Sequence, residues 1–232
     1  MNYSDFTVVI PTLNEEGNIA MLIERLTAAY SGLGIIVVDD DSEDRTSKIV
    51  RNFSKKNRRV TLIERKGKPR GLTASAAQGI MAAKTKFALV MDADMQHPIG
   101  AIKSIAIKLR SGNDLVIGVR ADVKDWALYR KIISKTLITV AYAILIVSGK
   151  SRSKDIFSGF FGVDRGLFAQ VYSKNRKRFV QGGYKILYDF LKCMRHKEMR
   201  IGEVPYSFGH REFGMSKAGF KQGMLLFKSF AS

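Results

Sequence analysis

The chain has 232 residues, of which 46% are hydrophobic, so it can bury a substantial core and is treated as one domain. Its single cysteine, Cys193, excludes an internal disulfide. The net charge of +18 and the isoelectric point near 10.1 indicate a surface that attracts polyanions: nucleic acid, anionic lipid or phosphorylated substrates.

Apolar runs alternate with helical patterns over residues 6 to 119. Continuous apolar runs predict buried strands, whereas apolar residues at helical spacing predict helices between them. The predicted strands are 6–10 (FTVVI), 35–39 (IIVVD), 60–64 (VTLIE), 87–91 (FALVM) and 114–119 (DLVIGV). A helix is predicted after each of the first four strands. The first carries Ile19 to Leu26 at helical spacing, and the second begins near Ser42. The third covers residues 73–84, and the fourth follows Pro98.

The alternation stops after Arg120. Residues 125–148 predict a helix that is basic at its start and apolar later, followed by a strand at 158–164, a helix at 182–194 and a strand at 200–208. The tail from Ser216 predicts an amphipathic helix. The longest uncharged run, 136–149, is shorter than the roughly 20 apolar residues of a membrane-spanning helix, and the N-terminus lacks signal-peptide features. We therefore expect no spanning segment here.

Strands that alternate with helices predict an α/β fold, with a mostly parallel, twisted sheet covered by helices on both faces. Ligands of such sheets bind beyond the carboxyl ends of the strands. We therefore expect the chemistry to lie in residues 11–15, 39–42 and 92–97 and around Arg120.

Asp92, Asp94 and Gln96 follow the strand 87–91 at every second position. In an extended chain these three side chains share a face. Carboxylate and amide oxygens are hard ligands that suit Mg²⁺ or Mn²⁺, and Mg²⁺ typically completes its shell with substrate phosphates and water. The alternative is that both acids only cap the helix that begins near Pro98.

A second acidic cluster, Asp39 to Asp41, ends the strand 35–39. A carboxylate at this place can accept hydrogen bonds from a base edge or a ribose, while Ser42 and Asp44 can cap the next helix. Like charges that gather at one edge of a sheet cost energy unless a cation compensates them. The chain contains neither G-x-G-x-x-G nor G-x-x-x-x-G-K-[ST], which argues against the usual dinucleotide and P-loop sites.

These motifs, taken together, resemble the GT-A glycosyltransferases, and among them the dolichyl-phosphate mannose synthases. The resemblance runs in order through VVIPTLNEEGNI, IIVVDDDSEDRT, RGLTASAAQG, VMDADMQHP, DLVIGVR, RKIISK, DIFSGFFGVDR, GGYKIL and HREFGMSK. It implies a GT-A (Rossmann-like) fold over 1–232, with a nucleotide-sugar half at 1–120. The acceptor half at 121–232 would carry C-terminal amphipathic helices near 126–148 and 216–230.

The resemblance also implies GDP-mannose as donor, dolichyl phosphate as acceptor, Mg²⁺ or Mn²⁺, and inversion in a single displacement. It places Asp92, Asp94 and Gln96 at the metal. It assigns the donor to Pro11, Asn14, Glu15, Asp39, Asp40, Asp92, Asp94, Arg120, Arg211 and Lys217. The catalytic set that it implies is Asp94, Arg120, Arg130, Ser134 and Arg211.

The basic residues of this catalytic set suit an anionic acceptor. Dolichyl phosphate is already an anion, so it needs no strong general base, but it needs cations to overcome repulsion from the donor diphosphate. Arg130 and Ser134 lie four residues apart, on one helical face, so both can hold one phosphate, although Lys131 could replace Arg130 there. The alternative is that Arg130 and Lys131 are ordinary surface charges. The alternative interpretation of Arg120 is a solvated residue at the end of a strand.

The expected partners include an anionic membrane surface at the cytosolic face but no nucleic acid. A membrane-anchoring domain or subunit is a further partner that stays open. Residues 137–147 and 220–230 offer apolar faces for peripheral contact, unless both helices pack on the sheet. Two other hypotheses remain. One keeps the fold and acceptor but uses UDP-glucose or another UDP-sugar; the other is a non-catalytic basic binding protein, which leaves the acidic strand ends without a role.

Overall fold

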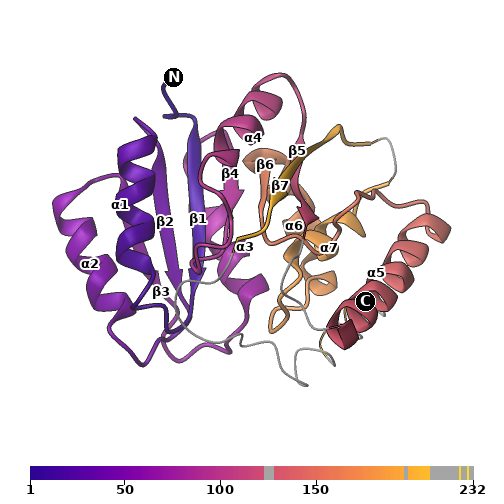
Figure 1. Cartoon of the computed structure of the whole chain (residues 1–232), viewed down its shortest axis with the longest axis horizontal. Coiled ribbons are helices and arrows are strands. Elements are labelled where there is room, and N and C mark those ends of the chain that lie inside the picture. Colours follow the sequence, from indigo (N-terminus) through magenta and orange to yellow (C-terminus); the bar gives the residue numbers. More distant parts are fainter. Residues whose placement is uncertain (123–127, 196–197, 210–224, 226–228, 230–232) are drawn as a thin grey trace.

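The computed structural model describes residues 1–122, 128–195, 198–209, 225 and 229, without the side chains of 122–137. The described residues form a seven-stranded sheet in the order β3-β2-β1-β4-β6-β5-β7 (Figure 1). Its strands are β1 (Phe6–Thr12), β2 (Gly34–Asp39), β3 (Val60–Glu64), β4 (Phe87–Val90), β5 (Leu115–Asp122), β6 (Phe161–Asp164) and β7 (Ile201–Ser207).

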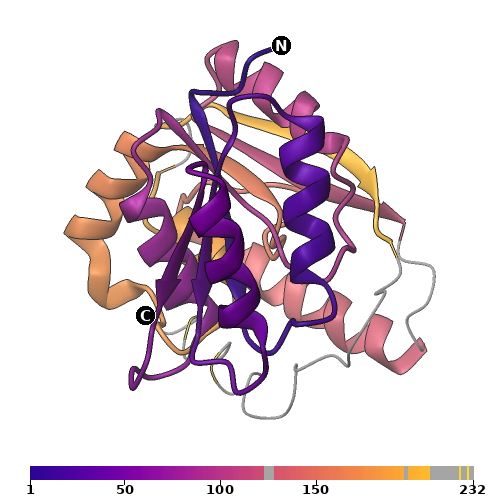
Figure 2. The same cartoon turned by 90° about the vertical axis from the view of Figure 1, so that its left-hand side faces the viewer.

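Helices cover this sheet on both faces. They are α1 (Ile19–Ala29), α2 (Thr46–Lys56), α3 (Leu72–Ala82), α4 (Ala101–Arg110), α5 (Leu128–Val147), α6 (Arg165–Asn175), the 3₁₀ turn η1 (Arg176–Arg178) and α7 (Ile186–Leu191). Figure 2 shows α1 and α6 on opposite sides of the sheet. None of the helices described here has the length and apolar character needed to cross a membrane.

The sheet is mostly parallel, as predicted. β1 pairs in parallel with β2 and β4, β2 with β3, and β5 with β7. Only β6, among the described strands, runs against its neighbours β4 and β5. Because β7 lies beside β5, the two predicted halves of the chain share one sheet, and their separate roles stay a prediction.

Side chains along a strand alternate between the two faces of the sheet, and both faces are buried here. This explains why the strand sequences are apolar without interruption. Val8 and Val9 are both fully buried, yet they belong to different cores because successive side chains point to opposite faces. One core contains residues of α1, α2 and α4, and the other contains residues of α3, α5, α6 and α7. Gly79 brings α3 very close to β1, since a Cβ there would lie 2.3 Å from Val9 Cγ1.

The predicted strands and most predicted helices are confirmed, with differences at their ends. The helix expected near Ser42 begins at Thr46, and the one expected at 182–194 is shortened to Ile186–Leu191. Helix α6 and the turn after it were not predicted. The amphipathic helix expected from Ser216 lies outside the described residues, apart from Leu225 and Ser229, which are both helical.

Candidate active site

The parallel strands bring the predicted site segments to one edge of the sheet. Thr12, at the end of β1, lies opposite Asp39, at the end of β2. β4 runs beside β1 in the same direction, so Asp92 follows it at this edge. β5 has the same direction and adds Arg120. Acidic and basic side chains from distant parts of the sequence therefore meet where α/β sheets usually bind ligands.

Asp39 is buried and holds the turns after β1 and β2 together. Its two oxygens accept hydrogen bonds from the Ser42 backbone N–H (2.9 Å), the Ser42 hydroxyl (2.6 Å) and the Thr12 hydroxyl (3.2 Å). The Asn14 N–H donates to the Ser42 Oγ at 2.8 Å, and the Asn14 Oδ1 accepts from the Glu43 N–H at 2.8 Å. Asn14 adopts a left-handed φ of 51°, which this network stabilises.

Pro11 and Glu15 frame the same turn. Pro11 is buried in β1, opposite Val38 of β2. The Glu15 N–H donates to the Thr46 hydroxyl (2.8 Å), and its carboxylate accepts from the Asn18 side-chain amide (2.8 Å). These contacts position the segment 11–15, whose part in nucleotide binding stays a prediction.

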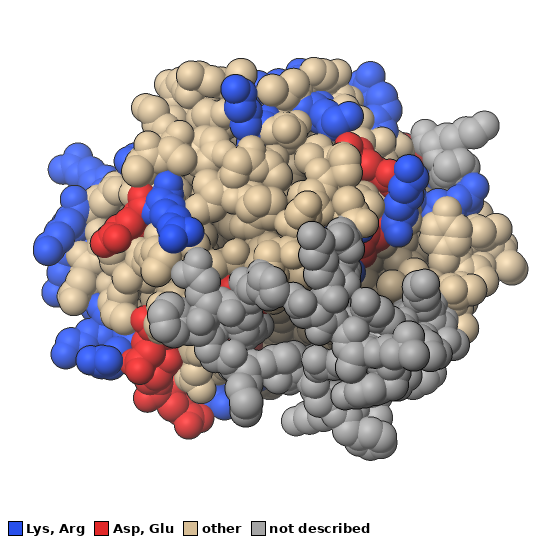
Figure 3. Space-filling model, in the orientation of Figure 1, with Lys and Arg blue, Asp and Glu red and all other residues tan. Residues whose placement is uncertain are grey.

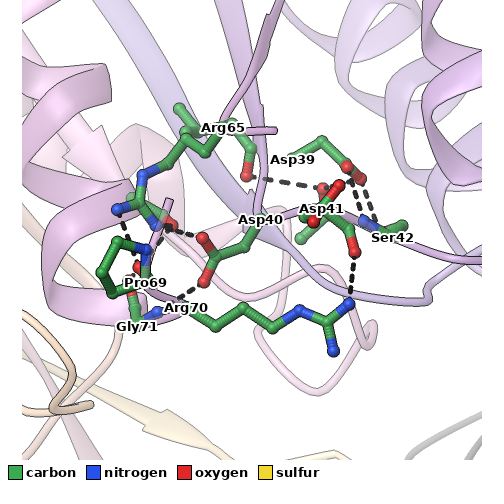
Figure 4. Close-up of polar contacts among 11 residues, drawn as sticks. Asp39, Asp40, Asp41, Ser42, Arg65, Pro69, Arg70 and Gly71 are labelled. Atoms are coloured by element: carbon green, nitrogen blue, oxygen red, sulfur yellow. Dashed lines mark hydrogen bonds and ion pairs between the residues drawn. The ribbon is translucent and has the colours of Figure 1, made fainter. Parts of the chain in front are cut away.

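Asp40 forms a buried ion pair with Arg65 and also accepts from the Gly71 N–H at 2.6 Å (Figure 4). Arg65 donates in turn to the Ser75 hydroxyl (3.1 Å) and the Pro69 carbonyl (3.1 Å). Each carboxylate oxygen of Asp40 thus already has a donor within the protein. Asp40 joins the ends of β2 and β3 to the start of α3, so any bond to a nucleotide would be additional to this role.

Asp92, Asp94 and Gln96 lie in the loop between β4 and α4. Asp94 is 5% exposed, whereas the Asp92 side chain is 33% exposed. The assumption of an extended chain was wrong, because Met95 has a left-handed φ of 64°, so the chain turns between Asp94 and Gln96. The Gln96 N–H donates to the Asp94 Oδ1 at 3.2 Å, and the Gln96 amide donates to the Gly209 carbonyl at 3.0 Å.

Helix capping does not explain these acids. Helix α4 begins at Ala101, and its N-cap is Gly100, which makes no side-chain cap. Asp94 lies six residues before that position. The alternative that Asp92 and Asp94 only cap this helix is therefore wrong.

Asp92, Asp94 and Gln96 carry the kinds of oxygen donor that a divalent metal prefers, and their convergence on one metal stays a prediction. Asp92 is partly accessible at the edge of the sheet, Asp94 is buried beside it in sequence, and both supply hard oxygen donors. The described ranges contain no group of three or more His, Cys, Asp and Glu arranged for a metal. A site with two carboxylates and one amide oxygen would leave room for phosphate and water ligands, as Mg²⁺ prefers.

Arg120 is held by Asp155, a partner that the sequence analysis did not identify. Its Nε and Nη2 atoms donate to the two carboxylate oxygens at 2.7 and 2.9 Å, and its guanidinium lies 5.8 Å from the centre of the Phe208 ring. Burial lowers the pKa of Arg120, but the hydrogen bonds and charge of Asp155 outweigh burial and raise it above its usual value. Arg120 is thus a fixed cation at the strand end and not a solvated one.

Lys185 is a second cation that the sequence analysis missed. It is half-buried, and its ammonium donates to the Phe157 carbonyl at 3.2 Å and lies 4.4 Å from the centre of the Tyr184 ring. Burial, followed by the charge of Arg120, lowers the pKa of Lys185 to about 8. Its position in GGYKIL, after two glycines, was the only signal that could have drawn attention to it.

Lys185→Met should change how stability depends on pH. Between about pH 8 and 10.5, the unfolded chain keeps the proton on Lys185 while the folded chain releases it. The free energy of unfolding of the native chain should therefore rise with pH across this window, relative to the Met variant, because the cost of burying a charge disappears. Urea titrations without ligand measure this difference. A difference that stays constant across the window would contradict the lowered pKa.

Four predicted site residues lack a described side chain. Arg130 and Ser134 lie one turn apart on the backbone of α5, as expected. Arg211 and Lys217 lie outside the described residues. Their contacts with phosphate stay predictions.

Comparisons with known proteins agree with this arrangement. The sequence model of glycosyl transferase family 2 matches residues 7–172. A dolichol-phosphate mannosyltransferase of Pyrococcus furiosus is 37% identical over 91% of this chain, which spans only 58% of that relative. Proteins of the same name from Mycosarcoma maydis and Saccharomyces cerevisiae are each 32% identical, and the chain covers 75% and 82% of their lengths.

Solved structures with little sequence identity share the fold. Glucosyl-3-phosphoglycerate synthase of Mycobacterium tuberculosis, crystallised with Mn²⁺ and UDP-glucose, has a TM-score of 0.67 at 18% identity, covering 97% of this chain and 76% of that protein. Mannosyl-3-phosphoglycerate synthase of Rubrobacter xylanophilus has a TM-score of 0.63 at 16% identity, covering 97% and 72%. The expected GT-A fold is confirmed. The chain is thus a glycosyltransferase of family 2, and within that family it belongs to the dolichol-phosphate mannosyltransferases.

Proposed function

We propose that this chain transfers mannose from GDP-mannose to dolichyl phosphate, with a divalent metal, at the cytosolic face of a membrane. The observation that carries the proposal is the likeness to dolichol-phosphate mannosyltransferases over 91 to 96% of the chain. The gathering of Asp39, Asp92 and Arg120 at one edge of the sheet agrees with it.

The reaction is a single displacement. An oxygen of dolichyl phosphate forms a bond to the anomeric carbon of mannose, the bond from that carbon to the diphosphate breaks, and GDP leaves with the electron pair. The acceptor is already an anion, so no strong base is needed. Catalysis then consists mainly of positioning and electrostatic stabilisation.

The residues of the site divide this work. Asp92, Asp94 and Gln96 would hold Mg²⁺ or Mn²⁺, which when bound supplies positive charge to the leaving diphosphate. Arg120 is fixed by Asp155. In this proposal its guanidinium would face the reacting phosphates. Arg130, Ser134, Arg211 and Lys217 are the further phosphate contacts that the family resemblance implies.

Gly159→Ala should weaken this site without disturbing the fold elsewhere. A Cβ at Gly159 would lie 2.8 Å from the Asp92 Oδ2, so the carboxylate has to move. We expect transfer to fall by about 10- to 100-fold at low metal concentration, with half-maximal transfer at a higher metal concentration, because displaced ligands lose metal affinity. The matched control is Gly100→Ala, where an added Cβ meets nothing within 4 Å. Equal transfer by the two variants would contradict the placement of Asp92 at the metal.

Contact with an anionic membrane is supported by α5. Val140, Ile146 and Val147 are exposed on this helix, the last of them by 89%. In both ribbon views, α5 lies toward the end of the molecule where β1 and β2 finish (Figures 1 and 2). An apolar helix face at this end of the molecule would let a lipid-linked phosphate approach the edge of the sheet from the bilayer.

Basic side chains line one edge of the molecule. Figure 3 shows basic side chains along the edge formed by α2, where Lys48, Lys55 and Lys56 are exposed. Such a surface would add a long-range attraction to anionic lipid, which salt screens.

Competition between nucleotides separates the two proposed donors. A fluorescent GDP analogue is bound in the presence of Mn²⁺ and displaced with GDP or UDP, and GDP should displace it at a lower concentration. A preference for UDP would replace mannose with a UDP-sugar and keep the fold and acceptor. Transfer of labelled mannose into the organic phase, with an EDTA control, then separates the enzyme from a basic binding protein, which would transfer no label from any donor.

A further inference from the structure

His97 occupies a place at the site that the proposed reaction does not yet use. It is 3% exposed and lies in the same loop as Asp92 and Asp94. Its Nε2 lies 3.1 Å from the Asp92 Oδ2, and its Nδ1 lies 3.0 Å from the Tyr206 hydroxyl. The imidazole therefore bridges the carboxylate to a side chain of β7, 109 residues further along the chain.

The two neighbours of His97 determine which ring nitrogen carries the hydrogen. A carboxylate only accepts, so Nε2 donates to Asp92, and in a neutral imidazole Nδ1 must then accept from the Tyr206 O–H. Burial raises the pKa of Tyr206 above its usual value, so its hydroxyl keeps the proton at neutral pH. An O–H that donates from Tyr206 thus stabilises the tautomer that donates to Asp92.

Aromatic packing fixes the plane of the same ring. His97 stacks on Phe160, with ring centres 4.9 Å apart and 16° between the planes, and meets the ring of Phe208 edge-on at 5.6 Å. Gly159, next to Phe160, approaches the Asp92 oxygen that His97 contacts. This packing limits rotation of the imidazole, so its Nε2 stays pointed at the Asp92 carboxylate.

We propose that His97, oriented by Tyr206, is a positioning residue that aims the Asp92 carboxylate at the divalent cation. The inference rests on the proposed function in one respect, the assignment of Asp92 as a metal ligand. Groups that orient a metal ligand through a hydrogen bond typically change metal affinity by about 10- to 100-fold when they are replaced. Replacement of His97 should therefore raise the metal concentration that transfer requires. The groups that take part in the reaction would stay in place.

Two replacements of His97 distinguish positioning from packing. The amide nitrogen of Gln can occupy the place of Nε2 and donate to Asp92, whereas that of Asn reaches only the place of Nδ1. We expect His97→Asn to weaken Mn²⁺ binding by about 10- to 100-fold and His97→Gln to restore most of it. Binding is measured in the presence of GDP, by the electron paramagnetic resonance signal of free Mn²⁺.

Tyr206→Phe provides a variant that keeps the aromatic core. It should weaken Mn²⁺ binding several-fold, because the imidazole loses the group that fixes its tautomer. The matched control is Tyr30→Phe, since the Tyr30 hydroxyl also donates to this loop, at the Ile99 carbonyl (2.6 Å), but away from Asp92. Tyr30→Phe should leave Mn²⁺ affinity unchanged. For His97→Asn, saturating Mn²⁺ should bring kcat for transfer back towards that of the native chain.

Several results would overturn the inference. They are native Mn²⁺ affinity in His97→Asn, equal losses in the Asn and Gln variants, or equal effects of Tyr206→Phe and Tyr30→Phe. Native Mn²⁺ affinity in Asp92→Asn would remove the metal assignment and the inference with it. If Mn²⁺ affinity follows the expected order but no donor supports transfer, the positioning role stands and the proposed function fails.

Discussion

Asp94→Ala should reduce transfer by about 1,000-fold or more while the chain keeps its fold, because a metal ion typically contributes several kcal/mol of charge stabilisation in the transition state. Asp94 is buried at the carboxyl edge of the sheet and is not the N-cap of α4, which is Gly100. Initial rates of mannose transfer at saturating Mg²⁺ measure the loss. Circular dichroism and thermal unfolding verify the fold.

A matched control for Asp94→Ala is Asp164→Ala. Asp164 caps α6, where its Oδ1 accepts from the Leu167 N–H at 2.9 Å. Its loss should cost about 1 kcal/mol of stability, as for a typical N-cap, and leave transfer unchanged. If Asp94→Ala behaves like Asp164→Ala, with lower stability and native transfer, Asp94 is structural and the metal assignment is wrong.

Arg65→Ala should lower the free energy of unfolding by about 3–5 kcal/mol, the usual cost of leaving one member of a buried ion pair without its partner. The Arg65 and Asp40 side chains are both only 6% exposed. The same substitution removes the donors to Ser75 and the Pro69 carbonyl, so the start of α3 keeps only part of its attachment to β2 and β3, through the Gly71 N–H and Asp40. Urea unfolding of the native chain and the variant measures the difference.

The comparison for Arg65→Ala is Arg45→Ala. Arg45 pairs with Glu16 at 3.1 Å, but their side chains are 76% and 40% exposed. Water and salt screen such a pair, so its removal should not change the unfolding midpoint measurably. Similar effects of the two substitutions would mean that the Asp40–Arg65 pair does not hold the strand ends together.

The sheet could be predicted from the sequence because its signal is local. An uninterrupted apolar run such as FTVVI suits a strand that is buried on both faces, and helical patterns separate these runs. The antiparallel direction of β6 could not be predicted, since a strand of four residues carries no mark of its orientation. Helix α6 was missed because its polar residues conceal the two buried side chains, Phe168 and Val171.

Only those features of the site that lie within one short segment of sequence could be predicted. Asp92 and Asp94 could be found because they directly follow a strand. Their partners could not, because the contacts join residues far apart in the sequence: Arg120 with Asp155, and His97 with Tyr206. The turn at Met95 was also hidden, since a left-handed φ is unusual outside glycine and depends on contacts with Gly209 that only the fold creates.

In the proposed reaction, one chain joins mannose to a lipid phosphate and releases GDP. Phosphorus NMR of a single mixture tests it most directly, with the protein, GDP-mannose, dolichyl phosphate, Mg²⁺ and detergent. We predict that the phosphomonoester signal of dolichyl phosphate gives way to a phosphodiester signal, while GDP appears in equal amount, and that EDTA stops both changes. GDP released with the lipid phosphate unchanged, or no change at all with the metal present, would contradict the account.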